Sequence, residues 1–511
     1  MLHKIRVEGK SGDLDKEDQL AWAMAKLARQ AVDFKVDVDV LDMVKNRLID
    51  NAAIALAAAN ELPVMVARSK ALASEGTGLS TIYGFDIGRG FAPEKAAFAN
   101  AVAVRYLDQD DTYLAAEYSH PDDNISPLLA IAQNKKISGA DLIRGIVVAY
   151  EIHVALVGTG NGTGISLHKH KVDHMTHIAA ASAAGIGAML ALTEDQIYNS
   201  INFAVHNSVS SRQSRKGKIG AQKEFVPGFS AEISMDSVNS AMYGLLGPNP
   251  IYEGVDSLIA QFLDGPNAEY IVELGPTDSG SLRNIMKTYP KEHSFEYQGQ
   301  AIIDLALDIR PQIESNGGIQ NIEKIVLKTS HHTHNVIGTG ANDPEKSDLS
   351  SPRGTLDHSI MFAIGRALES GEWHHEKSYL GITDNKPLAH LVRRIETTLD
   401  EKWEHRYHST DPKEQAFGGD ITVYFKDGSK ITGEKAVANA HVYGDNPWGR
   451  NEYIKKFDSL TNDKITSGER TRFLESVGRL EELTGPELRN LTLSMSGIKS
   501  VDSEISGVYS N

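Results

Sequence analysis

Residues 106–121 of the chain read YLDQDDTYLAAEYSHP and follow a run of small apolar residues that predicts a buried helix. If this helix continues through the segment, the four-residue spacing places Asp108 and Thr112 on one face. With His120 they bring together a carboxylate, a hydroxyl and an imidazole, which can move a proton and orient a polar ligand. The alternative is structural: Asp110 or Thr112 caps the helix, and His120 is satisfied inside a loop.

The residue sequence of this segment resembles the signature motif of the MmgE/PrpD family, which has an Asp, then DT, then AAE and HP. Further stretches match the family in the same order: VDHMTHIAAASAAGIGAMLALT, SRQSRKGKIGAQKEF, TYPKEHSFEYQGQAIIDLA, TSHHTHNVIGTGANDP and TLDHSIMF. Agreement of this length and order is far more specific than a single motif. The resemblance implies an all-helical domain, an inserted α+β domain that acts as a lid, an active site in the cleft between them, and a homodimer.

Helical periodicity dominates the first half of the chain. Leu41–Asn60 and Asp141–Val157 carry apolar residues at helical spacing, and Thr193–Gln196 fits a capping box that starts the next helix. The pattern then changes, because Ile322–Thr329 alternates like a strand and Asp420–Thr432 reads as a hairpin with an Asp-Gly turn. The predicted fold class is therefore mainly α, with a large all-helical domain and a smaller α+β domain.

Three regions follow from these patterns together with the resemblance. They are a helical domain (residues 1–281), an α+β lid domain (residues 282–440) and C-terminal helices that return to the helical domain (residues 441–511). Clefts between domains are where polar ligands tend to bind, and closure of a lid would exclude water.

The composition excludes several classes of protein. With no cysteine, the chain has no disulfide framework, no thiolate nucleophile and no Cys-ligated zinc or iron–sulfur cluster. The formal charge of −16 argues against general nucleic-acid binding. The first residues are charged almost throughout, and the apolar stretches are too short or too rich in small residues to span a bilayer. We therefore expect a soluble cytoplasmic protein without a nucleic-acid or membrane partner.

One basic segment interrupts this acidic chain. It carries no acidic residue and several cations, namely Arg212, Arg215, Lys216, Lys218 and Lys223. A single basic loop next to a His-rich segment is typical of a site for a small polyanion. The alternative is a solvated surface loop, which is the commoner fate of a charge run.

The activity that the resemblance implies is elimination of water from a hydroxy acid, which needs a base, an acid and cationic donors. Asp108, Thr112 and His120 match the family motif position by position, and His174 in VDHMTH matches a histidine of the family site. We expect Asp108, His120 and His174 to be the catalytic proton-transfer set, and the sequence leaves open which is acid and which is base.

The His-rich stretch around His168 and His170 allows a second interpretation as a metal site. The chain has no cysteine ligand, and no helical HExxH pattern accompanies these histidines. We therefore predict no metal and no other cofactor.

The carboxylates of the substrate need several cationic partners. Lys223 and Lys287 match lysines that line the pocket in relatives, and Arg212, on the same approach, suits bidentate carboxylate binding. The full set of predicted substrate-binding residues is Thr112, Arg212, Lys223, Lys287, His293, His331 and His332. Some relatives carry a catalytic tyrosine after the SHHTH stretch, where this chain has Asn335, so no tyrosine role is carried over.

The resemblance thus implies a 2-methylcitrate dehydratase, which forms 2-methyl-cis-aconitate and water in the methylcitrate cycle of propionate catabolism. One alternative is a cis-aconitate decarboxylase or another lyase for small di- or tricarboxylates. The other, from a different class, is a non-catalytic polyanion-binding protein. The expected partners are a small tricarboxylate substrate and a second copy of the chain.

Overall fold

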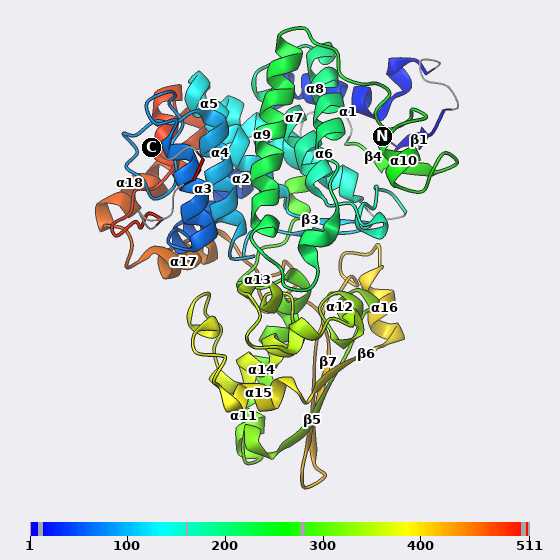
Figure 1. Cartoon of the computed structure of the whole chain (residues 1–511), viewed down its shortest axis with the longest axis vertical. Coiled ribbons are helices and arrows are strands. Elements are labelled where there is room, and N and C mark those ends of the chain that lie inside the picture. Colours follow the sequence, from blue (N-terminus) through cyan, green and yellow to red (C-terminus); the bar gives the residue numbers. More distant parts are fainter. Residues whose placement is uncertain (1, 9–13, 160–161, 276–281, 502–506, 509–511) are drawn as a thin grey trace.

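The chain folds around two hydrophobic cores, which lie one above the other in Figure 1. In this computed structural model the described residues are 2–8, 14–159, 162–275, 282–501 and 507–508. The first core draws on residues from Ile5 to Ile285 and again from Tyr453 to Leu493. The second core runs from Phe295 to Ile431.

Helices build the first core, and the predicted mainly α class is confirmed. They are α1 (Leu20–Gln30), α2 (Val38–Ala57), α3 (Leu62–Leu72), α4 (Pro93–Arg105), α5 (Ile125–Lys135), α6 (Gly139–Val157), α7 (Met175–Met189), α8 (Glu194–Asn207), α9 (Gln222–Met242) and α10 (Leu258–Phe262). A strand pair, β1 (Leu2–Arg6) with β4 (Glu269–Glu273), lies at the edge. In the described part of the chain no single helix is both long and apolar enough to cross a membrane; the pair α2 and α3 passes by length and composition but is bent by 100°.

The contact between α6 and α7 occupies the centre of the first core. A Cβ atom on Gly145 would lie 3.0 Å from the carbonyl oxygen of Gly185, and one on Gly185 would lie 2.7 Å from that of Gly145. The two glycines therefore let the helix backbones approach closely. Every residue of α7 is buried, which places His174, directly before the helix, in the interior of the molecule.

Capping hydrogen bonds set the starts of two helices. The Asp141 amide donates to the Ser138 hydroxyl at 3.1 Å at the start of α6, and Thr193 and Gln196 form a capping box at the start of α8. The predicted capping box is confirmed.

The condition that the helix continues through the segment after α4 is not met. The helix ends at Arg105, and Asp108 adopts a left-handed φ of 49°. The Thr112 amide donates to the carbonyl oxygen of Tyr289 at 3.1 Å instead of to a helical partner. Asp108 and Thr112 therefore lie in a turn, which the short strands β2 (Tyr113–Leu114) and β3 (Tyr118–Ser119) follow.

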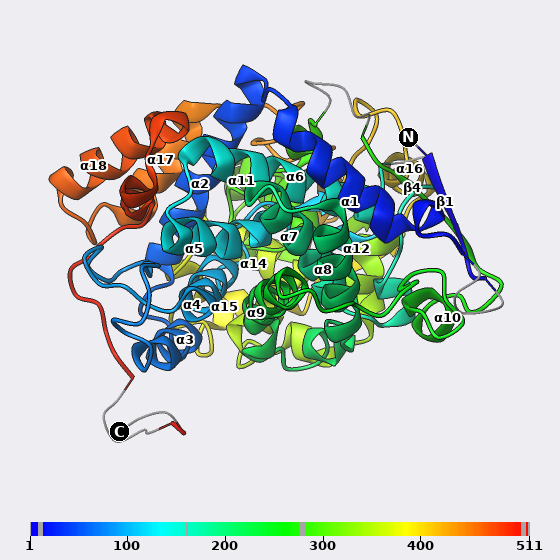
Figure 2. The same cartoon turned by 90° about the horizontal axis from the view of Figure 1, so that it is seen from above.

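The last helices of the chain pack against its beginning. Helices α17 (Arg450–Thr461) and α18 (Ser467–Gly478) contact α2, and Figure 2 shows them beside it. A buried ion pair of 2.7 Å joins Lys456 of α17 to Asp50 of α2. The same ammonium donates to the carbonyl oxygens of Gln109 and Lys291, so it connects α17 with the loops that carry the candidate site.

The second core combines a four-stranded sheet with helices. The strand order is β6 (Ile395–Leu399), β5 (Ile322–Thr329), β7 (Gly419–Phe425) and β8 (Lys430–Lys435), with β5–β6 parallel and the other pairs antiparallel. The helices are α11 (Gln300–Ser315), α12 (His331–Val336), α13 (Arg353–Leu356), α14 (Ile360–Ser370), α15 (Lys386–Val392) and α16 (Glu401–Tyr407). The predicted strand and Asp-Gly hairpin are confirmed, with Gly428 at a φ of 87° in the turn.

Candidate active site

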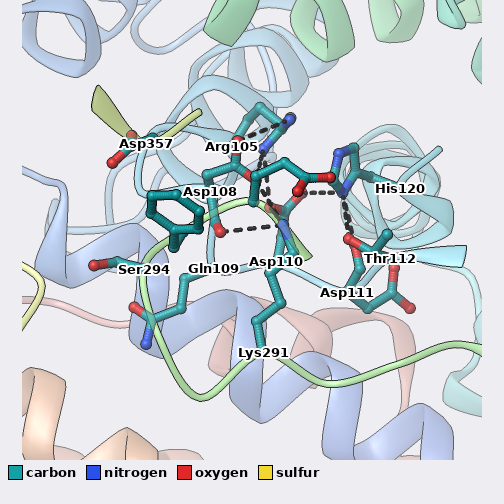
Figure 3. A network of polar contacts seen from close by, with 12 residues as sticks. Arg105, Asp108, Gln109, Asp110, Asp111, Thr112, His120, Lys291, Ser294 and Asp357 are labelled. Carbon is teal, nitrogen blue, oxygen red and sulfur yellow. Dashed lines mark hydrogen bonds and ion pairs between the residues drawn. The ribbon is translucent and has the colours of Figure 1, made fainter. Parts of the chain in front are cut away.

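Asp108 is the hub of a buried ionic network (Figure 3). Its Oδ1 lies 2.5 Å from Lys291 Nζ and 3.1 Å from Arg105 Nη1, and its Oδ2 lies 2.7 Å from Lys223 Nζ. All four side chains are at most 1% exposed. Burial by itself would raise the pKa of Asp108, but Arg105, Lys223 and Lys291 hold it well below its usual range. The carboxylate therefore stays ionised and fixes three cations in the interior.

His120 is held in one tautomer by the same turn. Its Nδ1 lies 2.7 Å from the carbonyl oxygen of Asp111 and 3.2 Å from the Thr112 hydroxyl. Because a carbonyl only accepts, Nδ1 carries the proton and Nε2 carries the lone pair. Burial, and then Arg105, lower the pKa of His120 well below its usual value. The ring is therefore a neutral imidazole whose Nε2 can accept a proton.

His174, the cap residue of α7, is held in the same Nδ1–H tautomer, but its occupied nitrogen is Nε2. Arg215 Nη2 donates to His174 Nε2 at 3.2 Å, while Arg215 also binds both carboxylate oxygens of Asp173 at 2.9 and 3.2 Å. A guanidinium only donates, so Nε2 accepts and Nδ1 carries the proton. Burial and Arg215 lower the pKa of His174 to about 3. Its Nδ1 is buried without a hydrogen-bond partner among the described residues.

The two imidazoles adjoin each other edge to face. Their ring centroids are 5.7 Å apart, and the planes meet at 66°. His120 has a free acceptor nitrogen and His174 has a free N–H donor. A polar ligand beside the pair would meet complementary groups, as acid–base chemistry on a hydroxy acid requires.

Arg212 adds a cationic donor near these rings. Its Nη2 donates to the Tyr118 hydroxyl, and the guanidinium carbon lies 4.9 Å from the centroid of that ring. Its Nη1 is buried and has no hydrogen-bond partner within the described ranges. A carboxylate could bind there, because Arg presents a planar pair of donors.

His332 of α12 belongs to a second group of aromatic side chains. Its ring stacks on Tyr407 at 4.7 Å and lies 6.2 Å from the Tyr118 ring. Burial and the neighbouring imidazoles lower the pKa of His332 to about 3. His332 also lines a cavity of about 770 Å³, together with Tyr113 and Tyr289. The second core therefore contributes to the surroundings of the site through this helix.

Lys287, His293 and His331, three of the predicted binding residues, form no hydrogen bond or ion pair with residues 106–112 in the described structure. Lys287 is exposed and lines the 770 Å³ cavity. His293 lies 2.7 Å from the carboxylate of Asp304, which raises its pKa against the effect of burial. His331 is exposed, and its amide donates to Glu404. The structure thus brings together Asp108, Thr112, His120, His174, Arg212 and Lys223 around one turn and places these three elsewhere.

Sequence reasoning missed the two closest partners of Asp108 besides Lys223. Arg105 ends the apolar run of α4, and Lys291 lies in the KTYPKEH stretch that contains Lys287. A charged residue at the end of a buried helix was the signal for Arg105. No spacing rule selects Lys291 over Lys287, because the loop around them has no regular periodicity.

A second group of acidic residues lies beside the first. Carboxylate oxygens of Asp110, Asp122 and Asp123 lie within 4.8 Å of one another, and all three side chains are buried. Oxygen ligands of this kind suit a hard cation. Burial and the mutual repulsion of the carboxylates raise the pKa values of Asp122 and Asp123 well above the usual range. The raised pKa values favour bound protons on Asp122 and Asp123, while Asp110 pairs with Arg105 at 3.1 Å.

The second core also reaches the hub directly. His358, which lies between α13 and α14, has Nε2 at 3.5 Å from Asp108 Oδ2, and its Nδ1 lies 3.0 Å from the carbonyl oxygen of Gly354. Gln109 donates to the carbonyl oxygen of Glu292 at 2.6 Å. The site therefore forms where residues of the two cores meet.

Comparisons with known proteins agree with this architecture. The sequence profile of the MmgE/PrpD N-terminal domain matches residues 18–271, and that of the MmgE/PrpD C-terminal domain matches residues 293–482. The 2-methylcitrate dehydratase of Salmonella typhi is 25% identical over 420 residues, which cover 78% of this chain and 82% of that protein.

Other relatives extend the range of activities. The 2-methylcitrate dehydratase of Escherichia coli K12 is 24% identical over the same shares of both chains. The alkylcitrate dehydratase phiI of a fungal species is 23% identical over 419 residues, or 76% of each chain. Since the two domain profiles together match most of the sequence, the chain belongs to the MmgE/PrpD family.

Proposed function

We propose that this protein is a hydro-lyase that removes water from 2-methylcitrate to give 2-methyl-cis-aconitate. The observation that carries the proposal is the adjoining pair of neutral imidazoles, His120 with a free Nε2 acceptor and His174 with a free Nδ1–H donor, beside a buried cluster of cations. The curated relatives named above, at about one quarter identity, support the same reaction. At this level of identity, the relatives support membership of the family more firmly than they support a particular substrate.

The geometry supports a role for each side chain. His120 Nε2 takes the proton from the carbon next to a carboxylate, because its Nδ1 is committed to Asp111. The His174 Nδ1–H and the free Nη1 of Arg212 orient the carboxylates and stabilise the charge that develops on one of them. We assign Asp108 to holding Lys223 and Lys291 rather than to proton transfer, because a carboxylate beside three cations is a weak base.

The test is a turnover assay on protein treated with a chelator. With 2-methylcitrate as substrate, ultraviolet absorbance follows the conjugated alkene, and citrate and cis-aconitate run alongside. We expect the absorbance to rise with 2-methylcitrate at an unchanged rate after chelation. Carbon dioxide release from cis-aconitate without dehydration would indicate a decarboxylase, and binding of tricarboxylates without any turnover would indicate a binding protein.

A matched substitution tests the role of the base. His120→Gln should lower kcat by roughly 10²–10⁴-fold, the usual contribution of a positioned general base. The change should leave the melting temperature nearly unaltered, because glutamine can keep a hydrogen bond to the Asp111 carbonyl. A loss of activity that follows a collapse in stability would instead make His120 a structural residue.

A specific observation favours a second candidate, dehydration of citrates with longer alkyl substituents. The 770 Å³ cavity is much larger than a methyl group requires, and its walls include Tyr113 and Tyr289. Tyr113 follows Thr112 in the sequence, and Tyr289 pairs with Thr112 through a β-bridge. One relative is named alkylcitrate dehydratase. Measuring kcat/KM for 2-methyl-, 2-butyl- and 2-hexylcitrate decides between the candidates: a rise with chain length favours the second, and a steep fall favours 2-methylcitrate.

A further inference from the structure

Glu296 is a half-buried acidic residue that the predicted site did not include. It directly precedes the short turn Tyr297–Gly299 that leads into α11. Its Oε2 accepts a hydrogen bond from the Gln298 amide at 2.8 Å, and its own amide donates to the carbonyl oxygen of Asp357 at 3.1 Å. The other oxygen, Oε1, has no hydrogen-bond partner in the part of the chain that the structure describes. The group is therefore held in place with one oxygen free to react.

The neighbours of Glu296 come from both cores. Lys291 and Lys346 are the cations that face it, and Asp108 is the anion. The hydroxyls of Tyr118 and Tyr407, from β3 and α16, also interact with it electrostatically. Glu296 therefore lies within electrostatic reach of the ionic hub at Asp108 and of the two tyrosines whose rings contact His332.

Accessibility distinguishes Glu296 from the other carboxyl groups of this region. Those that are at most 2% exposed are Asp108, Asp110, Asp111, Glu117, Asp122, Asp123, Asp173 and Asp357. Glu296 is only half-buried as a residue, although protein surrounds it on all sides. Glu296 thus keeps surface that a small ligand could contact, whereas the carboxylates at most 2% exposed do not.

The surroundings also set its protonation. Burial raises the pKa of Glu296 to about 7, even though Lys291 acts in the opposite direction. A neutral carboxyl group is therefore present near neutral pH, and Lys291 and Asp108 act electrostatically both on it and on His120, which burial keeps unprotonated. In enzymes, an acid and a base are usually two titratable groups whose surroundings shift their pKa values apart, so that one holds a proton while the other lacks one.

We propose that Glu296 is the general acid that protonates the hydroxyl group as it leaves the substrate, a role that rests on the dehydratase function proposed above. His120 Nε2 takes the proton from carbon, and the C–H electron pair becomes the second bond of the alkene. The C–O pair stays on the oxygen, which takes the Glu296 proton and departs as water. The step leaves an imidazolium and a carboxylate, and proton exchange with solvent restores both groups.

The test compares two leaving groups. Fluoride leaves without protonation, so an analogue of 2-methylcitrate with fluorine in place of the hydroxyl does not need the acid. Glu296→Gln should slow dehydration of 2-methylcitrate by roughly 10²–10⁴-fold and leave fluoride release within about threefold of the wild type. His120→Gln should slow both reactions. Glutamine keeps an oxygen acceptor for the Gln298 amide, and melting temperatures check that the variants fold.

A pH profile gives a second readout. In the wild type, kcat/KM should fall as the pH rises through about 7, since the acid must be protonated. Glu296→Gln should lose this limb and Glu296→Asp should retain it. The control is Glu292→Gln, four residues earlier and exposed, which should behave as the wild type.

Results that differ from these expectations separate the role of Glu296 from the proposed dehydratase function. Equal losses with both leaving groups, or an unchanged rate for Glu296→Gln, would overturn the role of Glu296 while the dehydratase function stands. If the wild type leaves 2-methylcitrate intact but dehydrates citrate or a longer alkylcitrate, the same comparison applies to that substrate. If it dehydrates none of them, the proposed function and the role of Glu296 both fall.

Discussion

Two groups of buried aspartates lie side by side in this protein and differ in charge. Asp108 has three cations within 3.1 Å and a pKa well below the usual range. Asp122 and Asp123 are equally buried, but they face mainly other carboxylates, and their pKa values lie well above it. Burial alone favours the protonated form, so the difference shows that the nearby cations decide the charge of each group.

The largest effect should come from removing the charge of Asp108. Asp108→Asn leaves Lys223 and Lys291 buried without their anion, and we expect a loss of about 3–5 kcal/mol in the free energy of unfolding. Denaturant titration measures it. Asp123→Asn is the control and should cost less than about 1 kcal/mol, because that group already carries a proton. Similar losses in both variants would mean that the two groups do not differ in charge.

A second comparison concerns two lysines four residues apart. Lys291 is buried and binds both the carboxylate and the carbonyl oxygen of Asp108, whereas Lys287 is exposed. Lys291→Met should cost about 3 kcal/mol, since it breaks a buried pair. Lys287→Met should leave the unfolding curve almost unchanged. A large loss from Lys287→Met would show that this side chain takes part in the ionic network.

The pH dependence of stability should differ between the two groups. The pKa of Asp123 is raised in the folded state, so this group stabilises the fold fully at pH values below its unfolded-state pKa of about 3.9. This stabilisation is lost as the pH rises toward the folded-state pKa. The lowered pKa of Asp108 has the opposite sign, and its contribution is lost only as the pH falls below about 4.

Unfolding of the wild type and Asp123→Asn at pH 5 and pH 8 isolates this effect. Relative to the wild type, the variant should gain on the order of 1 kcal/mol between the two pH values, because it no longer ionises at that position. Parallel stability curves would contradict a raised pKa at Asp123.

The smallest effect expected is that of metal removal. If protons neutralise Asp110, Asp122 and Asp123, neither a chelator nor added Ca²⁺ or Mg²⁺ should shift the melting temperature by more than about 1 °C. A rise that grows with cation concentration, and that Asp123→Asn abolishes, would assign a cation to this group instead.

Much of the fold could be predicted from local patterns. Helical spacing located α2 and α6, the Thr193 capping box located the start of α8, and the Asp-Gly pair located the hairpin between β7 and β8. These signals work because they depend on residues a few positions apart. The expected helix through Asp108 failed because the turn there is held by contacts with Lys291 and Tyr289, far away in the chain.

The candidate site was predictable in part for the same reason. The short motif and the family resemblance selected Asp108, Thr112, His120 and His174, which the structure places around one turn. Neither could select Lys291 over Lys287, or find Glu296, since these residues lie in short irregular segments where the chain passes from the first core to the second. The burial of Lys291 arises only when the two cores meet.

The sequence by itself determined the mainly α class, the helix and hairpin signals, the absence of cysteine chemistry and the set of acid–base side chains. Only the tertiary structure decided which nitrogen of His120 and His174 is free, which aspartates are charged, and which lysine binds Asp108. The physical reason is that tautomers and pKa values depend on burial and on partners within a few ångströms. Those partners come from segments up to 183 residues apart, so no local pattern contains them.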